Sequence, residues 1–191
     1  MSHFLVALRQ QLQAHAQACP AQAGLAAGFA GLLDDGEAAF LRERLAGHFT
    51  GSAWLVSADG QRALLMHHRK LDRWLQPGGH ADGDTDLAAV ALKEAQEESG
   101  LPALRLEDGV IFDLDRHWIP ARGEVPGHWH FDVRYVVRNV GSEVFQLNPE
   151  SLALAWREVA AIAADPASDA SLVRMARRWL EHPAGANGSR P

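Results

Sequence analysis

The sequence contains a single cysteine, Cys19, among its 191 residues. One cysteine excludes a disulfide framework within the chain and a zinc site built on paired cysteines. Basic residues are also in the minority, with 18 lysines and arginines against 24 aspartates and glutamates and a formal net charge of −6. This balance argues against a broad surface for a nucleic-acid polymer, which normally carries a basic patch, but it leaves a single nucleotide open as a ligand.

The sequence also lacks a long apolar run. No run approaches the roughly 18 residues that a membrane helix needs, and the first 24 residues have neither the basic start nor the long apolar centre of a signal peptide. Hydrophobic residues make up 47% and charged residues 22%, which is an ordinary globular balance. We therefore expect a cytoplasmic protein without membrane contacts, with the length of one domain and a modest extension.

The first 47 residues have apolar side chains at helical spacing but no chemical motif. Helices are predicted over 2–18, through 25–33 and over 37–47. Pro20 ends the first of them, and an Asp-Asp-Gly turn at 34–36 precedes the third. We expect residues 1–47 to form a helical extension that serves for packing or for assembly of a homodimer.

The pattern changes at residue 47, where β-rich runs replace helical periodicity. Strands are predicted over 48–57 and 62–68, with the hairpin signal "ADGQ" between them. One or two strands are predicted over 103–119, and further strands over 127–140 and 152–159. A closing helix is predicted over 171–182. The Gly/Asn/Ser/Pro-rich tail at 183–191 is expected to be flexible.

Three glutamates, Glu94, Glu97 and Glu98, stand at i, i+3 and i+4 in a stretch of strong helix formers. This spacing places the carboxylates on one helical face, where like charges cost a few tenths of a kcal/mol per pair. Asp84 or Asp86 can cap the start of this helix, and a glycine follows its end. A divalent cation relieves the repulsion, and Mg²⁺ prefers carboxylates together with phosphate oxygens and water. The alternative is a solvated helix face.

The residues around these glutamates follow a fixed spacing. Gly79 is followed by five residues, Thr85 and seven further residues, and then by "KEAQEESGL" at 93–101; "WLQPGG" leads into the segment. In this register the sequence resembles the signature of the Nudix hydrolase superfamily at six positions. These positions are Gly79, Glu94, Glu97, Glu98, Gly100 and Leu101.

Two positions depart from the Nudix signature. Thr85 stands where the family has its first glutamate, and Lys93 stands where it has an arginine. A lysine cannot supply the bidentate fork of an arginine, so we expect a different brace for the loop before the helix. Asp82, Asp84 and Asp86 are nearby candidates for that brace.

The resemblance implies an α/β fold, an α/β/α sandwich around a mixed β-sheet over residues 48–182. It also implies Mg²⁺-dependent hydrolysis of a diphosphate linkage in a nucleoside diphosphate derivative or a similar small phosphoanhydride, with Mn²⁺ as a possible substitute. Glu94, Glu97, Glu98 and the backbone carbonyl of Gly79 would hold the metal. Glu97 and Glu98 are the catalytic candidates, and Glu98 is the first candidate for the general base.

Basic residues outside the signature are candidates for substrate binding. Arg69, Lys70 and Arg73 come just before "WLQPGG", and an arginine there can offer paired donors to a phosphate. A solvated turn between strands explains them equally well.

Histidines form a second group. His128, His130 and Asp132 alternate along one predicted strand and therefore share a face, and His80 directly follows Gly79. Two histidines and a carboxylate on one face can bind Zn²⁺, Mn²⁺ or Fe²⁺, contact a substrate phosphate, or form a hydrogen-bonded polar cluster. The sequence leaves these alternatives open.

Two further functions are compatible with the same resemblance. Type I isopentenyl diphosphate isomerases resemble Nudix proteins and bind metal through histidines and glutamates, but they have a degraded box and a catalytic cysteine near the glycine–histidine turn. Here the box is almost complete, and Cys19 falls in the helical extension. A non-catalytic, nucleotide-sensing Nudix domain is the other alternative, and retention of the three glutamates counts against it.

Overall fold

The computed structural model describes residues 3–149 and 151–181. The predicted flexible tail at 183–191 lies outside the described residues. Eight strands form one mixed sheet, whose main path runs in the order β3-β2-β1-β7-β5. The strands are β1 Gly47–Val56, β2 Arg62–His68, β3 Arg73–Leu75, β4 Gly78–His80, β5 Leu104–Leu106, β6 Asp113–Ile119, β7 His128–Asn139 and β8 Ser151–Glu158.

The centre of the sheet is the parallel pair of β1 and β7. All other pairs are antiparallel, and three of them lie off the main path: β4 with β1, β6 with β7, and β8 with β2. β1 is long enough to pair with β2 through its last residues and with β4 through its middle. β4 therefore lies on the same edge of β1 as β2.

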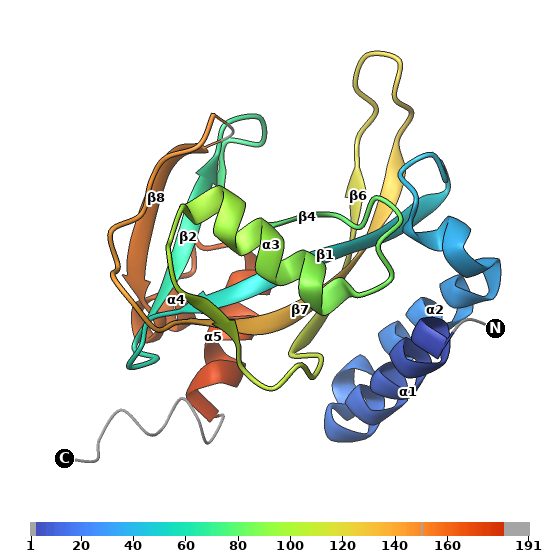
Figure 1. Cartoon of the computed structure of the whole chain (residues 1–191), viewed down its shortest axis with the longest axis horizontal. Helices are drawn as coiled ribbons and strands as arrows, with labels where there is room; N and C mark the ends of the chain where they lie inside the picture. Colours follow the sequence, from blue (N-terminus) through green and yellow to red (C-terminus); the bar gives the residue numbers. More distant parts are fainter. Residues whose placement is uncertain (1–2, 150, 182–191) are drawn as a thin grey trace.

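Helices cover both faces of the sheet (Figure 1). They are α3 Leu87–Ser99, in front of the sheet in this view, and α4 Val159–Ala164 and α5 Ala170–Glu181, behind it. Alternation along β1 sends Ala53 and Leu55 into a cluster with α3, and Trp54 and Val56 into a cluster with α4 and α5. The predicted α/β/α sandwich around a mixed sheet is confirmed.

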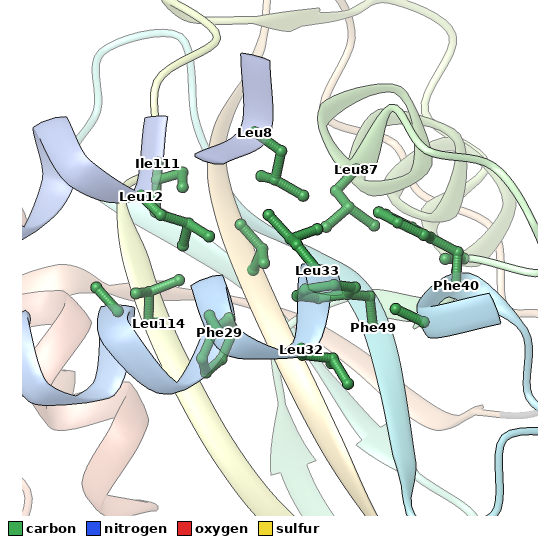
Figure 2. Packing of buried hydrophobic residues seen from close by; sticks show 14 of the residues in the cluster. Leu8, Leu12, Phe29, Leu32, Leu33, Phe40, Phe49, Leu87, Ile111 and Leu114 are labelled. Atoms are coloured by element: carbon green, nitrogen blue, oxygen red, sulfur yellow. The ribbon is translucent and has the colours of Figure 1, made fainter. Parts of the chain in front are cut away.

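The N-terminal segments add to the core on the α3 side. They are α1 His3–Ala18, the 3₁₀ turn η1 Pro20–Gln22, α2 Ala23–Leu32 and the 3₁₀ segment η2 Leu33–Phe40. Figure 2 shows Leu12 and Phe29 in one cluster with Phe49 of β1 and Leu114 of β6. Gln22 Nε2 also donates to the Leu114 carbonyl at 2.9 Å. These helices thus share one apolar core with the sheet.

The predicted third helix over 37–47 is wrong in extent. The 3₁₀ segment η2 ends at Phe40, and residues 41–46 form turns before β1. Gly36, at φ 63°, interrupts the helical geometry, while Phe40 is fully buried. Arg44 then donates to the Asp35 carboxylate and to the Gly47 carbonyl, both at 2.5 Å. These tertiary contacts override the helix propensity of the segment.

Within the ranges 3–149 and 151–181, no helix combines the length and the apolar character that a membrane crossing requires.

Candidate functional site

The helix α3 has well-defined ends. The Asp86 side chain accepts a hydrogen bond from the Ala89 amide at 3.0 Å, and Gly100 closes the helix in the left-handed conformation at φ 63°. Asp84 accepts from the Asp86 amide at 2.9 Å, so Asp86 is the cap and Asp84 supports it. A side-chain cap of this kind contributes about 1 kcal/mol.

Two of the three glutamates meet the short strand β4. Glu98 is 6% exposed, and its Oε2 accepts a hydrogen bond from the Gly78 amide at 3.0 Å. The Glu94 carboxylate lies against Gly79, where a Cβ atom would come within 2.5 Å of its carboxyl carbon. The helical turn from Glu94 to Glu98 therefore presents two carboxylates to the Gly78–Gly79 backbone.

Glu97 lies on the solvent side of this pair. Its side chain is 59% exposed, against 17% for Glu94. Lys93 Nζ lies 3.9 Å from an oxygen of each of these two glutamates, which is too long for a hydrogen bond. The structure thus places Glu94 and Glu98 against β4 and leaves Glu97 exposed to solvent, and Lys93 makes no hydrogen bond to the loop among the described residues.

An arginine from outside the signature braces that loop instead. Arg42 Nε donates to Asp82 Oδ1 at 2.6 Å, and its Nη2 donates to the other carboxylate oxygen. The pair joins the turn after η2 to the loop between β4 and α3, where Gly83 also donates to the Phe40 carbonyl at 2.9 Å. The hydrogen bond from Arg42 lowers the pKa of the Asp82 carboxyl. Asp82 was one of the three expected candidates, whereas Arg42 was not anticipated.

A polar stripe crosses the sheet on the face opposite α3. His48, Thr50 and Ser52 alternate along β1, and the parallel register sets Thr50 beside Asp132 and Ser52 beside Arg134 of β7. The buried Asp132 carboxylate accepts hydrogen bonds from Thr50, Ser52 and Arg134 at 2.7–2.9 Å. Asp132 therefore shares a face with the histidines of β7, as expected, but its side chain belongs to this hydrogen-bonded group.

Four histidines gather at one end of the stripe. The nitrogens of His48, His80, His128 and His130 all lie within 4.8 Å of one another. Strand register explains this cluster. His48 of β1 is paired with His130 of β7, and His80 of β4 is paired with Thr50, two residues after His48 on β1. Sequence reasoning singled out the other three but missed His48, since nothing before the β1–β7 register connects it with them.

Burial keeps histidines of this cluster uncharged. Burial lowers the pKa of His80 to about 4, and the positive charge of Arg42 adds to the effect. Burial also lowers the pKa of His130, with the neighbouring His80 as the second cause. The pKa of His48 falls for the same first reason. These rings are neutral near pH 7, the form in which an imidazole binds a metal.

The two arginines expected near a substrate lie in different surroundings. Arg69 donates to the carbonyl oxygens of Pro149 and Ser151 at 3.0 and 3.3 Å. Arg73 begins β3 and lines a cavity of about 870 Å³ together with Trp74 and Arg157. The Arg157 guanidinium lies 4.7 Å from the centroid of the Trp74 ring. A phosphate-binding role for Arg69 or Arg73 stays a prediction.

Solved structures with a similar fold include two hydrolases and a MutT protein. The chain matches an Ap4A hydrolase of C. elegans in a binary complex, with a TM-score of 0.56 and 19% identity over 72% of this chain and 98% of that one. A MutT protein from Methanosarcina mazei gives a TM-score of 0.54 and 17% identity over 71% and 94%. A NUDIX family hydrolase from Clostridium perfringens gives 0.53 and 21% over 69% and 95%. At these identities the likeness shows the fold.

A search of curated protein sequences finds no match. The family model described as the NUDIX domain matches residues 48–180, which is most of the chain. That span contains the sheet except for Gly47, the glutamate-bearing helix α3 and nearly all of α5. The chain therefore belongs to the NUDIX family.

Proposed function

We propose that this protein is a Mg²⁺-dependent hydrolase that cleaves a diphosphate linkage in a nucleoside diphosphate derivative or a similar small phosphoanhydride. The observation that carries the proposal is the convergence of Glu94 and Glu98, one turn apart on α3, on the Gly78–Gly79 backbone of β4. Membership of the NUDIX family supports it. Two structural neighbours, an Ap4A hydrolase and a MutT protein, are consistent with it.

The donor set fits a hard divalent cation. Carboxylate and carbonyl oxygens are the ligands that Mg²⁺ prefers, and position 79 has no Cβ atom to keep the Glu94 carboxylate away. Glu94, Glu97, Glu98 and the Gly79 carbonyl would hold Mg²⁺, or Mn²⁺ in its place. When bound, such a cation neutralises phosphate charge and lowers the pKa of a coordinated water.

The protein residues have separable roles in the proposed reaction. A water oxygen attacks one phosphorus, the bridging P–O bond breaks, and the proton of the water passes to a carboxylate. Glu98 is the first candidate for this base, because the Gly78 amide orients its buried carboxylate. Glu97 is the second candidate, since its exposed carboxylate belongs to the same helix.

The candidates for contact with a substrate phosphate are positively charged or hydrogen-bonding side chains outside the signature. We propose that Arg69 or Arg73 meets a substrate phosphate, because a guanidinium offers paired donors. His128 and His130 stay alternatives for that role. We further propose a cytoplasmic protein that acts on a small molecule rather than a nucleic-acid polymer. A homodimer is proposed as well, and light scattering during gel filtration measures it.

A substrate panel tests the proposed chemistry. Nucleoside diphosphate derivatives and dinucleoside polyphosphates are incubated with the protein and Mg²⁺, and release of phosphate or mononucleotide is measured. We expect E98Q to lower turnover by roughly 10²- to 10⁴-fold, the usual contribution of a general base, and E94Q and E97Q to raise the Mg²⁺ requirement. E124Q, in the exposed hairpin between β6 and β7, is the matched control and should leave turnover unchanged.

Two outcomes contradict the proposal. Unchanged turnover in both E97Q and E98Q would place the chemistry elsewhere. Formation of dimethylallyl diphosphate, or nucleotide binding by calorimetry without hydrolysis over hours, would instead support the isomerase or the sensing domain.

A further inference from the structure

The four-histidine cluster brings together ring nitrogens from three strands. His48 belongs to β1, His80 to β4, and His128 and His130 to β7. Their ligand atoms lie within 4.8 Å of one another, and His48 and His128 are 1% and 7% exposed. The cluster lies on the sheet face opposite α3, so it is distinct from the glutamates that converge on Gly79.

Two of the rings are held in one tautomer by backbone carbonyls. His128 Nδ1 lies 2.9 Å from the Pro126 carbonyl, and His48 Nδ1 lies 3.4 Å from the Arg44 carbonyl. A carbonyl oxygen only accepts, so Nδ1 of each ring carries the donated proton, and Nε2 is the nitrogen left to offer a lone pair. Metal-binding histidines commonly donate their other N–H to a carbonyl in this way.

The two lone pairs that result differ in their partners. His48 Nε2 is buried and has no hydrogen-bond partner among the described residues. His128 Nε2 lies 3.2 Å from His130 Nε2. It accepts a hydrogen bond there only if His130 carries a proton on Nε2. Leaving a buried polar atom unpaired costs about 1–3 kcal/mol. A cation among the four rings would satisfy these lone pairs together.

The ligand chemistry selects the class of cation. Imidazole nitrogens suit zinc and neighbouring transition metals, whereas Mg²⁺ prefers oxygen. Four protein ligands leave no open position on a tetrahedral Zn²⁺, which is the arrangement of structural rather than catalytic zinc sites. We propose that His48, His80, His128 and His130 form a structural site for a divalent transition metal, with Zn²⁺ as the reference ion.

Such a site would link three strands of the sheet, β1, β4 and β7. It would tie β4 to the central pair β1 and β7 through His80, the residue after Gly79. A fixed His80 would restrain the backbone at which Glu94 and Glu98 converge. The metal would thereby stabilise the fold and hold β4 in place without touching the substrate.

Metal binding by the full-length, tag-free protein tests the proposal. The protein is stripped with a chelator and titrated with Zn²⁺ by calorimetry, and separately with Co²⁺, whose absorption spectrum reports tetrahedral nitrogen ligands. We expect one ion per chain, a higher thermal midpoint with Zn²⁺, and no displacement by millimolar Mg²⁺. H48Q and H128Q should each weaken Zn²⁺ binding by roughly 100-fold or more, at or beyond the loss seen when a supporting residue is removed.

Matched variants separate this site from others. H67Q, on β2 outside the cluster, should bind Zn²⁺ like the native protein. E98Q should also retain Zn²⁺, so that failure of the proposed hydrolase and failure of this site are distinguishable. The proposal would be overturned if the native protein bound Zn²⁺ no more tightly than H128Q, or if it gave no tetrahedral Co²⁺ spectrum. The Co²⁺ spectrum of the native protein decides this even when a histidine variant does not fold.

Discussion

The carboxylate of Glu94 occupies the space that a side chain at position 79 would need. A Cβ atom built on Gly79 would lie 2.5 Å from Glu94 Cδ and 2.6 Å from its Oε2. Real Cβ atoms do not approach other heavy atoms so closely, so either the carboxylate or β4 would have to move. The glycine of the NUDIX signature is therefore required here by its missing side chain, at a backbone position without positive φ.

We expect Gly79→Ala to remove most of the activity with a smaller effect on stability. The added methyl group displaces the Glu94 carboxylate, and a misplacement of about 1 Å can cost roughly 10²-fold in rate. Turnover with Mg²⁺ and a thermal melt on the same preparation measure the two effects. Gly24→Ala is the control, because a Cβ there meets nothing within 4 Å. Equal turnover in both variants would contradict the described role of Glu94.

We expect Phe29→Ala to destabilise the whole protein. Phe29 of α2 is fully buried, and its ring lies 6.0 Å from that of Phe49 and 5.2 Å from that of Phe131. Truncation should lower the free energy of unfolding by about 3–5 kcal/mol. Because the helices and the sheet share this core, chemical denaturation should still show one transition. Phe4→Ala, at a residue that is 55% exposed, should change the free energy by less than about 0.5 kcal/mol.

Two separated transitions, with only the first shifted by Phe29→Ala, would mean that the N-terminal helices unfold independently of the sheet.

Arg174 of α5 forms a charge network with two carboxylates of β6. Arg174 Nη2 donates to the carboxylates of Asp113 and Asp115, both at 2.7 Å. Burial alone would raise the pKa of Asp115, but hydrogen bonds and charges from His117, Arg134 and Arg174 outweigh it and hold the pKa well below its usual range. Arg174→Met should lower the free energy of unfolding near pH 7 by about 2 kcal/mol, between the values for exposed and buried ion pairs.

The pH dependence of this effect has a definite sign. A carboxyl whose pKa is lower in the folded protein stabilises it above the unfolded pKa of about 3.9, and this contribution is lost as the pH falls through the folded value. The difference in unfolding free energy between native protein and Arg174→Met should therefore narrow below about pH 4. Urea denaturation at several pH values measures it. The Arg177 Nε atom donates to the Ala163 carbonyl and to no carboxylate among the described residues. Arg177→Met should therefore change the free energy of unfolding only slightly at every pH.

The sequence predicted the local elements that depend on neighbouring residues. The helix carrying Glu94, Glu97 and Glu98, its aspartate cap and its closing Gly100 all follow from propensity and capping within a short stretch. The long strand β7 likewise follows from its alternation. The helix predicted over 37–47 was wrong for the opposite reason. Its residues are helix formers, but Arg42 and Arg44 make contacts outside the segment, with Asp82 and Asp35.

Composition, periodicity and one gap-free spacing thus determined the class of fold and pointed to a carboxylate site on a helix. Only the tertiary structure decided how exposed each glutamate is, that Arg42 pairs with Asp82 in the loop before α3, and that His48 joins His80, His128 and His130. The physical reason is that strand register and the packing of helices on a sheet bring together residues up to about 80 positions apart, and no local pattern encodes those distances.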